Sequence, residues 1–215
     1  MEPLLLLFDV DGTLFVTDDP LVGRALRETL SECFHVELPE DALERVDHEG
    51  QTSLRIGRLV LRDAGLDDRE IDAGLEPWCA ELSARYLELL RDADTSAWAA
   101  GLGAEQALTR LVEAGHRLAL LTGNPEPVAR ARLDRLGLAR FFAAGQGAFG
   151  CESESRAELI GLARARAGVW QAVATVELGD TPRDASSARE AGIRSIVLGN
   201  AGLEGAVAQL LAWAA

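Results

Sequence analysis

The chain has 215 residues, of which 48% are hydrophobic, so it can form one domain or one core with a smaller insert. Its net charge of −14 argues against nucleic acid or an anionic membrane surface as a partner. All 21 basic residues are arginine, and the lack of lysine excludes a P-loop phosphate site and Schiff-base chemistry. A G-x-S-x-G nucleophile motif is also missing.

Two further absences bear on compartment and redox state. No segment is apolar for long enough to form a signal peptide or a membrane span, so we expect a soluble, cytoplasmic protein. The cysteines are odd in number, far apart and without a C-x-x-C pair; they are Cys33, Cys79 and Cys151. We therefore expect three free thiols, with neither a zinc site nor a disulfide framework.

The first predicted element is a strand that ends in two carboxylates. Leu4–Phe8 is a continuous apolar run, which is typical of a strand buried on both faces. Asp9 and Asp11 follow it, two positions apart, and Gly12 then allows the backbone to turn sharply. Because residues two apart on a strand share a side, we expect both carboxylates to face the same spot.

Residues 17–94 contain no predicted strand and are expected to form an all-α insert. Apolar spacing and capping residues predict four helices, of which Thr52 or Ser53 begins the third. The predicted helices cover Pro20–Cys33, Pro39–Val46, Ser53–Ala64 and Asp67–Leu90. In the last of these, Pro77 is expected to break or restart the helix.

From residue 95 onward, short apolar strands alternate with helices. Four more strands are predicted at Arg117–Leu121, Phe141–Gly145, Val173–Leu178 and Arg194–Leu198. The helices are predicted at Ala104–Ala114, Pro125–Leu136, Ser155–Ala167, Pro182–Ala191 and Leu203–Trp213. This alternation predicts a Rossmann-like α/β core, residues 1–16 and 95–215, with a five-stranded parallel sheet covered on both faces.

Ligands of such sheets bind beyond the carboxyl ends of the strands, and polar residues follow three of the predicted strands. They are Asp9-Val10-Asp11, Thr122-Gly123-Asn124 and Gly179-Asp180-Thr181-Pro182-Arg183-Asp184. Arg156 lies in the first turn of the helix that precedes the fourth strand. In this order the set resembles the four motifs of the haloacid dehalogenase-like (HAD) hydrolase superfamily. It is most similar to phosphoglycolate phosphatase-like members with a helical cap, which here would be residues 17–94.

The resemblance implies roles in phosphoryl transfer. Asp9 would attack phosphorus to form an aspartyl-phosphate, and Asp11 would protonate the leaving oxygen and then activate water. Arg156 would offset the charge of the phosphoryl group. The donors to that group would be the residues after the second strand, namely Thr122, Gly123 and Asn124.

The carboxylates of this set outnumber the nearby cations, which favours a hard divalent ion with oxygen ligands. The resemblance likewise implies Mg²⁺ as the cofactor. Its predicted ligands are Asp9, Asp11, Asp180 and Asp184. Asp11 would bind through its backbone carbonyl, and Asp184 would either ligate the ion or support the ligands. In the cap, Gln51 and Thr52 of the loop 48–52 are candidate substrate contacts, although Thr52 suits a helix cap equally well.

The predicted activity is therefore Mg²⁺-dependent hydrolysis of a small phosphorylated metabolite. The alternatives are a phosphomutase of the β-phosphoglucomutase type and a catalytically inactive binding protein on the same scaffold. Thr181 and Asp184 also fit a simple capping box. Residues 145–150 match G-x-G-x-x-G, but Glu152 and Glu154 directly follow and would repel a dinucleotide, so a glycine-rich loop is the better interpretation.

Overall fold

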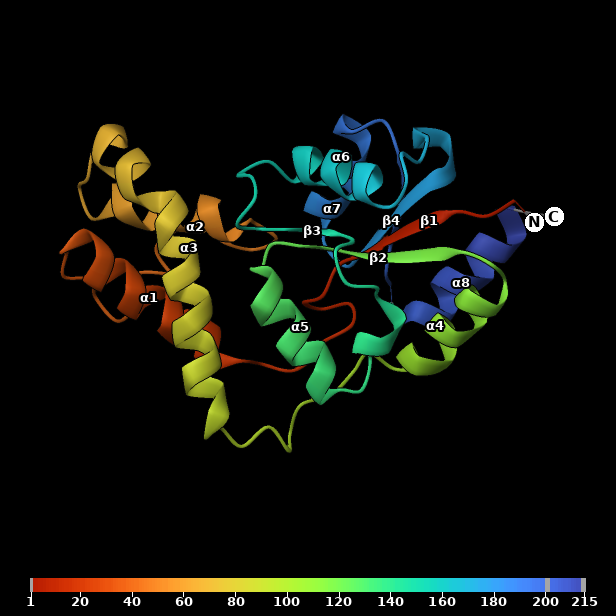
Figure 1. Ribbon diagram of the computed structural model, residues 1–215, viewed down its shortest axis with the longest axis horizontal. Helices are drawn as coiled ribbons and strands as arrows, with labels where there is room; N and C mark the ends of the chain where they lie inside the picture. Colours follow the sequence, from red (N-terminus) through yellow and green to blue (C-terminus); the bar gives the residue numbers. More distant parts are fainter. Residues whose placement is uncertain (1, 200–201, 214–215) are drawn as a thin grey trace.

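The computed structural model describes residues 2–199 and 202–213, and its centre is a five-stranded sheet (Figure 1). All strands are parallel, in the order β3-β2-β1-β4-β5. They are β1 (Leu5–Phe8), β2 (Arg117–Thr122), β3 (Ala148–Phe149), β4 (Thr175–Gly179) and β5 (Arg194–Val197). Phe8 pairs with Leu120 on one side and with Leu178 on the other, so β1 is the central strand. The predicted α/β architecture is confirmed.

Helices cover both faces of the sheet, as Figure 1 shows. One face packs against α6 (Arg156–Arg166) and α7 (Pro182–Glu190). The other packs against α4 (Ala104–Glu113), α5 (Glu126–Arg135) and α8 (Gly202–Trp213). Leu5 and Leu7 of β1 pack on the first face, and Leu6 and Phe8 pack on the second. Burial on both faces explains why this strand reads as an unbroken apolar run.

Three helices between β1 and α4 lie together beside the sheet (Figure 1). They are α1 (Pro20–Phe34), α2 (Ser53–Asp63) and α3 (Asp68–Arg91). They share a hydrophobic cluster that is separate from the two clusters on the sheet and includes Leu30, Leu61 and Trp78. None of the described helices combines the length and the apolar character needed to cross a membrane.

Two predictions in this helical segment are wrong. Residues 39–46 form consecutive turns instead of a helix, with backbone bonds three residues apart, such as Ala42 N to Pro39 O at 3.1 Å. Ala42 is buried, and Leu43 and Val46 are partly buried against the same cluster, so the turns already place the apolar side chains of this short stretch without a regular helix. Pro77 lies inside the 24-residue helix α3, because buried side chains on either side of it, Leu75 and Trp78, hold the helix against α1 and α2.

The third strand was predicted too early in the chain. Ala139–Phe141 is a short 3₁₀ helix, and β3 lies at Ala148–Phe149, within the glycine-rich stretch. Gly147 has a φ of +96°, and a Cβ at this position would overlap the carbonyl of Leu120 on β2. The glycine-rich stretch therefore serves close approach to a neighbouring strand and not a dinucleotide. A second 3₁₀ helix, Ala172–Ala174, precedes β4.

The expectation of three free thiols is also wrong. Cys79 of α3 and Cys151, which follows β3, form a disulfide across a sequence separation of 72 residues, whereas Cys33 is free and exposed. Their separation in the sequence gave no sign of this pairing, because only the packing of α3 beside the end of β3 brings the two side chains together. The bridge joins the helical segment covalently to the sheet-bearing part of the chain.

Candidate active site

The end of β1 places Asp9 at the centre of the candidate site. Its backbone N–H donates to Leu178 O at 2.9 Å, which continues the pairing of β1 with β4. The side chain is almost fully buried, and burial raises the pKa of the Asp9 carboxyl well above its ordinary value. Arg156 opposes this shift, with its Nη2 3.6 Å from Asp9 Oδ1.

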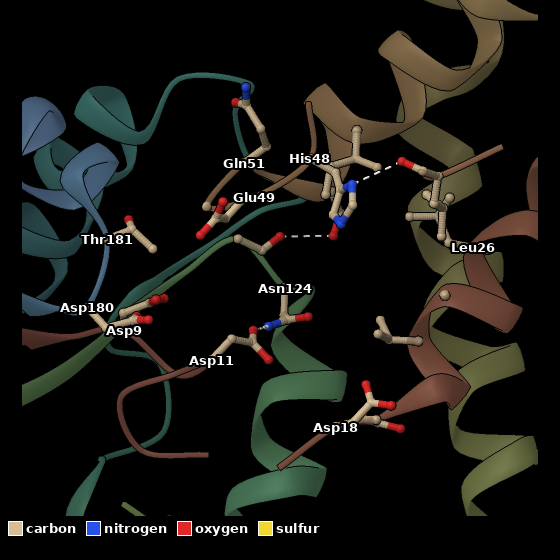
Figure 2. Close-up of a pocket in the computed structure, with 18 of the residues that line it drawn as sticks. Asp9, Asp11, Asp18, Leu26, His48, Glu49, Gln51, Asn124, Asp180 and Thr181 are labelled. Atoms are coloured by element: carbon tan, nitrogen blue, oxygen red, sulfur yellow. Dashed lines mark hydrogen bonds between the residues drawn. The ribbon is translucent and has the colours of Figure 1, made fainter. Parts of the chain in front are cut away.

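Asp11 leaves the strand in the turn that follows. Gly12 has a φ of +71°, and a Cβ on it would overlap the carboxylate of Asp180, so the turn requires glycine. The carboxylate of Asp11 is 54% exposed and points along the cavity, where it accepts hydrogen bonds from Asn124 and, at 2.7 Å, from Arg132 Nη1 (Figure 2). Asp11 therefore faces the same cavity as Asp9 but has its own donors.

The end of β4 supplies Asp180 and Asp184. The predicted capping box at the start of α7 is present: Thr181 N donates to Asp184 Oδ2 at 2.9 Å, and Asp184 N donates to Thr181 Oγ1 at 3.3 Å. The other carboxylate oxygen of Asp184 accepts a hydrogen bond from Arg156. The capping box and the acidic site are thus compatible, because the cap holds Asp184 in place beneath Asp180.

Arg156 is surrounded by carboxylates at the start of α6. Besides Asp9 and Asp184 it contacts Glu177 of β4, with Arg156 Nη2 3.4 Å from Glu177 Oε1. Burial raises the pKa of Glu177 to about 8, and Arg156 opposes the shift. Glu177 was not predicted, although a carboxylate inside an otherwise apolar strand was a signal for it in the sequence.

These aspartates fit a divalent cation. One carboxylate oxygen from each of Asp9, Asp180 and Asp184 lies within 4.8 Å of the others. Burial and neighbouring carboxylates raise the pKa of both Asp180 and Asp9. A bound cation would therefore stabilise the charged form of these groups. An all-oxygen donor set of this kind suits Mg²⁺. Because both oxygens of Asp184 already accept hydrogen bonds, Asp9 and Asp180 are the better-placed ligands.

The residues after β2 join the site to the helical segment. Gly123 O accepts from Ser53 N at 2.8 Å and from Ser53 Oγ at 2.9 Å. A Cβ on Gly123 would overlap the carbonyl of Gln51, so this contact requires glycine. Thr122 is fully buried and accepts from Asn124 N at 3.2 Å.

A cavity of about 470 Å³ unites most of the predicted residues. Figure 2 shows Asp9 and Asp180 at one end, Asp11 and Asn124 beside them, and Gln51 with its neighbours on another side. Three predicted residues do not line it, namely Thr122, Thr52 and Asp184. The hydroxyl of Thr52 caps α2 by accepting from Arg55 N at 3.2 Å.

A buried ionic cluster next to Asp11 was not predicted at all. Arg132 of α5 has Nη2 2.7 Å from Asp19 Oδ2, in addition to its contact with Asp11. Tyr86 of α3 donates to the same Asp19 oxygen at 2.8 Å. A signal was present in the sequence, because Arg132 shares a helix face with the apolar residues Val128, Ala129 and Leu133.

The carboxylate cluster and Arg156 lie at the carboxyl ends of the parallel strands. This is the edge at which α/β enzymes bind their ligands. Residues 4–192 match the family model described as haloacid dehalogenase-like hydrolase. The chain belongs to this family and is therefore a hydrolytic enzyme.

Named relatives agree with this assignment. The chain is 32% identical to a phosphoglycolate phosphatase of Rhodospirillum rubrum over 91% of its own length and 79% of the relative's. It is 28% identical to a phosphoglycolate phosphatase of Agrobacterium fabrum, over 89% and 78% of the two chains. Among solved structures, a β-phosphoglucomutase of Clostridium difficile is similar in fold, with a TM-score of 0.64, 16% identity, and coverage of 93% of this chain and 86% of that one.

Proposed function

We propose that the protein is a Mg²⁺-dependent phosphatase that hydrolyses a small phosphate monoester through an aspartyl-phosphate on Asp9. The observation that carries the proposal is the placement of the Asp9 carboxylate. It lies in the acidic cluster with Asp180, 3.6 Å from Arg156, at the inner end of a cavity that also contains Asp11. Relatives named phosphoglycolate phosphatase support a phosphatase over other hydrolases.

In the first half of the reaction, an Asp9 oxygen attacks phosphorus. The bond from phosphorus to the alcohol oxygen breaks, and a proton from Asp11 goes to that oxygen. Arg156 offsets the negative charge of the phosphoryl group, and the Gly123 and Asn124 segment offers hydrogen-bond donors to its oxygens. Mg²⁺ held by Asp9, Asp180 and the Asp11 carbonyl would supply the positive charge that lets two anions approach each other.

In the second half, Asp11 takes a proton from water, the resulting nucleophile attacks phosphorus, and Asp9 is released with inorganic phosphate. Asn124 and Arg132 both donate to the Asp11 carboxylate, which orients this acid and base along the cavity. Asp184 and Glu177 act on Arg156 and do not touch the substrate.

Residues 17–94 are proposed as a cap on a core of residues 1–16 and 95–215. In support, a hydrophobic cluster comes mainly from α1–α3, joined by Val128 of α5, and the start of α2 docks on the core through Ser53 and Gly123. Arg58 of α2 also forms an ion pair with Glu154, at 2.7 Å, on the core side.

The test is hydrolysis of p-nitrophenyl phosphate with Mg²⁺ and with a chelator, by the wild type, by Asp9→Asn and by Asp63→Asn. Asp63 is an exposed carboxylate at the end of α2 and serves as the control. We expect metal-dependent turnover that is lost only in Asp9→Asn. Turnover that survives in Asp9→Asn, or a wild-type rate that the chelator leaves unchanged, contradicts the mechanism. The phosphomutase alternative predicts conversion of glucose 1-phosphate to glucose 6-phosphate without release of phosphate, and an inactive scaffold predicts neither reaction.

A further inference from the structure

We propose that the alcohol part of the substrate carries no negative charge, so that the substrate is the phosphate ester of a neutral or amine-bearing alcohol and not of a hydroxy acid. This inference rests on the proposed phosphatase function and concerns the outer wall of the same cavity. The outer wall is defined here as the lining contributed by residues 18–26 and 43–56. It faces the alcohol when the phosphoryl group lies against Asp9.

The outer wall contains carboxylates without a matching cation. Asp18 and Glu49 both line the cavity, and neither forms an ion pair with any other residue that the structure describes. Arg156 is the only arginine among the described lining residues, and it is held at the inner end by Asp9, Glu177 and Asp184. A carboxylate on the substrate would therefore meet like charge in this wall and lose its own hydration.

The arginines within or beside the segments of this wall are already paired with carboxylates that do not line the cavity. Arg183 donates to Glu49 O at 2.9 Å and to Asp47 at 2.8 Å, and Arg55 lies 3.5 Å from Glu154. Neither lines the cavity. An anionic substrate group would have to break these pairs to obtain a cation, whereas a hydroxyl or an ammonium group would not.

His48 presents an acceptor to the cavity. Its Nδ1 is 2.9 Å from Leu43 O and 3.2 Å from Val46 O, and since carbonyl oxygens only accept, the proton is assigned to Nδ1. In the neutral ring Nε2 is then an acceptor. Figure 2 shows His48, Glu49 and Gln51 gathered on one side of the cavity. Acceptors of this kind complement O–H and N–H donors.

Apolar side chains form another part of the outer wall. Val22 and Leu26 come from α1, Leu43 from the turns, and Ile56 from α2. Apolar side chains and hydrogen-bond acceptors together fit the carbon skeleton of a polyol or an amino alcohol. The like charge of Asp18 and Glu49 would also act against hydroxy-acid esters, which is a repulsive source of specificity. This expectation differs from the substrate in the names of the two curated relatives.

The test uses three esters of nearly equal size that differ in charge. They are phosphoethanolamine, ethylene glycol monophosphate and phosphoglycolate, whose alcohols are cationic, neutral and anionic. We expect kcat/KM for the first two to exceed that for phosphoglycolate at least tenfold, and the ratio to shrink as salt is added. p-Nitrophenyl phosphate is assayed in parallel as a measure of the proposed function.

Charge-removing variants test the cause. In Asp18→Asn combined with Glu49→Gln, kcat/KM for phosphoglycolate should rise relative to ethylene glycol monophosphate, by about threefold or more. Glu44→Gln removes a carboxylate that is also exposed but lies outside the cavity, and should leave the ratio unchanged. Turnover of p-nitrophenyl phosphate reports that each variant is folded.

Each outcome has a distinct meaning. Hydrolysis of phosphoglycolate at or above the rate of the other two esters overturns the inference and leaves the proposed function standing. Turnover of p-nitrophenyl phosphate alone also overturns the inference, because the wall would then not select a small neutral or cationic alcohol. Lack of turnover of all four esters overturns the proposed function and the inference with it. An unchanged charge preference in the double variant refutes the assignment to Asp18 and Glu49.

Discussion

Replacing Arg132 by methionine is expected to destabilise the protein strongly. The Arg132 side chain is 1% exposed, and its partner Asp19 is 2% exposed, so the substitution leaves a buried carboxylate without its cation. Removing one partner of a buried ion pair typically costs about 3–5 kcal/mol. Methionine keeps the aliphatic part of the side chain but removes the guanidinium, whose carbon lies 4.9 Å from the centroid of the Phe15 ring. The lost contact with Asp11 adds only about 0–1 kcal/mol, because that carboxylate is half exposed.

The charge state of Arg132 supports this magnitude. Burial lowers the pKa of the guanidinium, but the nearby Asp11, Tyr86 and Asp19 outweigh burial and raise the pKa above its ordinary value. The arginine is therefore charged at every pH at which the protein is folded. Asp19 retains hydrogen bonds from Tyr86 and from Leu21 N at 3.1 Å after the substitution, so the expected loss is nearer to 3 than to 5 kcal/mol.

Urea denaturation measures the free energy of unfolding of the wild type, Arg132→Met, and Arg132→Met combined with Asp19→Asn. Asparagine removes the uncompensated charge, so the double variant should recover part of the stability that Arg132→Met loses. Arg130→Met is the matched control, because Arg130 lies two positions away and pairs with Glu126, which is 43% exposed, and we expect it to lose less than about 1 kcal/mol. A loss of under about 1 kcal/mol in Arg132→Met, or no recovery in the double variant, refutes the reasoning.

Three other variants test separate parts of the structure. Burial lowers the pKa of His116, so its neutral ring contributes stability above about pH 6.5 that is lost on acidification. The free energy of unfolding of His116→Asn should therefore depend less on pH between pH 7 and pH 5 than that of the wild type. Cys151→Ser opens a disulfide across 72 residues and should lose about 4 kcal/mol in urea, with no further effect of reductant. Gly123→Ala places a methyl group against the carbonyl of Gln51 and should lower kcat/KM at least tenfold, whereas Gly161→Ala, where a Cβ meets open space, should not.

The positions of Asp9 and Asp180 could be predicted because they depend on sheet topology alone, whereas Arg156, in the first turn of α6, was expected from the resemblance to the family. Once the strands are recognised as parallel, their carboxyl ends must lie along one edge, and polar residues directly after those ends must meet there. The contacts of Asp11 could not be predicted in this way. They depend on the partners at the far end of its side chain, Asn124 and Arg132, which come from two other elements.

The same distinction applies to the errors. Residues 39–46 have helix-forming composition, but so short a segment is not helical unless tertiary packing favours a helix there. Pro77 is unfavourable locally but is outweighed by the packing of α3. The disulfide joins cysteines that are 72 residues apart in the sequence, on α3 and just after β3, so no local sequence pattern could predict it. In each case a contact between distant segments decided the outcome, and local propensity or spacing did not.

Asp11 is held by both parts of the chain. Its carboxylate contacts Arg132 of α5, and Arg132 contacts Asp19, which caps α1. Tyr86 of α3 also donates to Asp19, so any shift of α1 or α3 relative to α5 changes the environment of Arg132. Since Arg132 is one of two donors to Asp11, the orientation of the proposed acid and base depends on the position of the helical segment. In the proposed mechanism, contact of the substrate with the outer wall would therefore be linked to the readiness of Asp11 for proton transfer, because the segment that forms this wall also contacts the arginine that donates to Asp11.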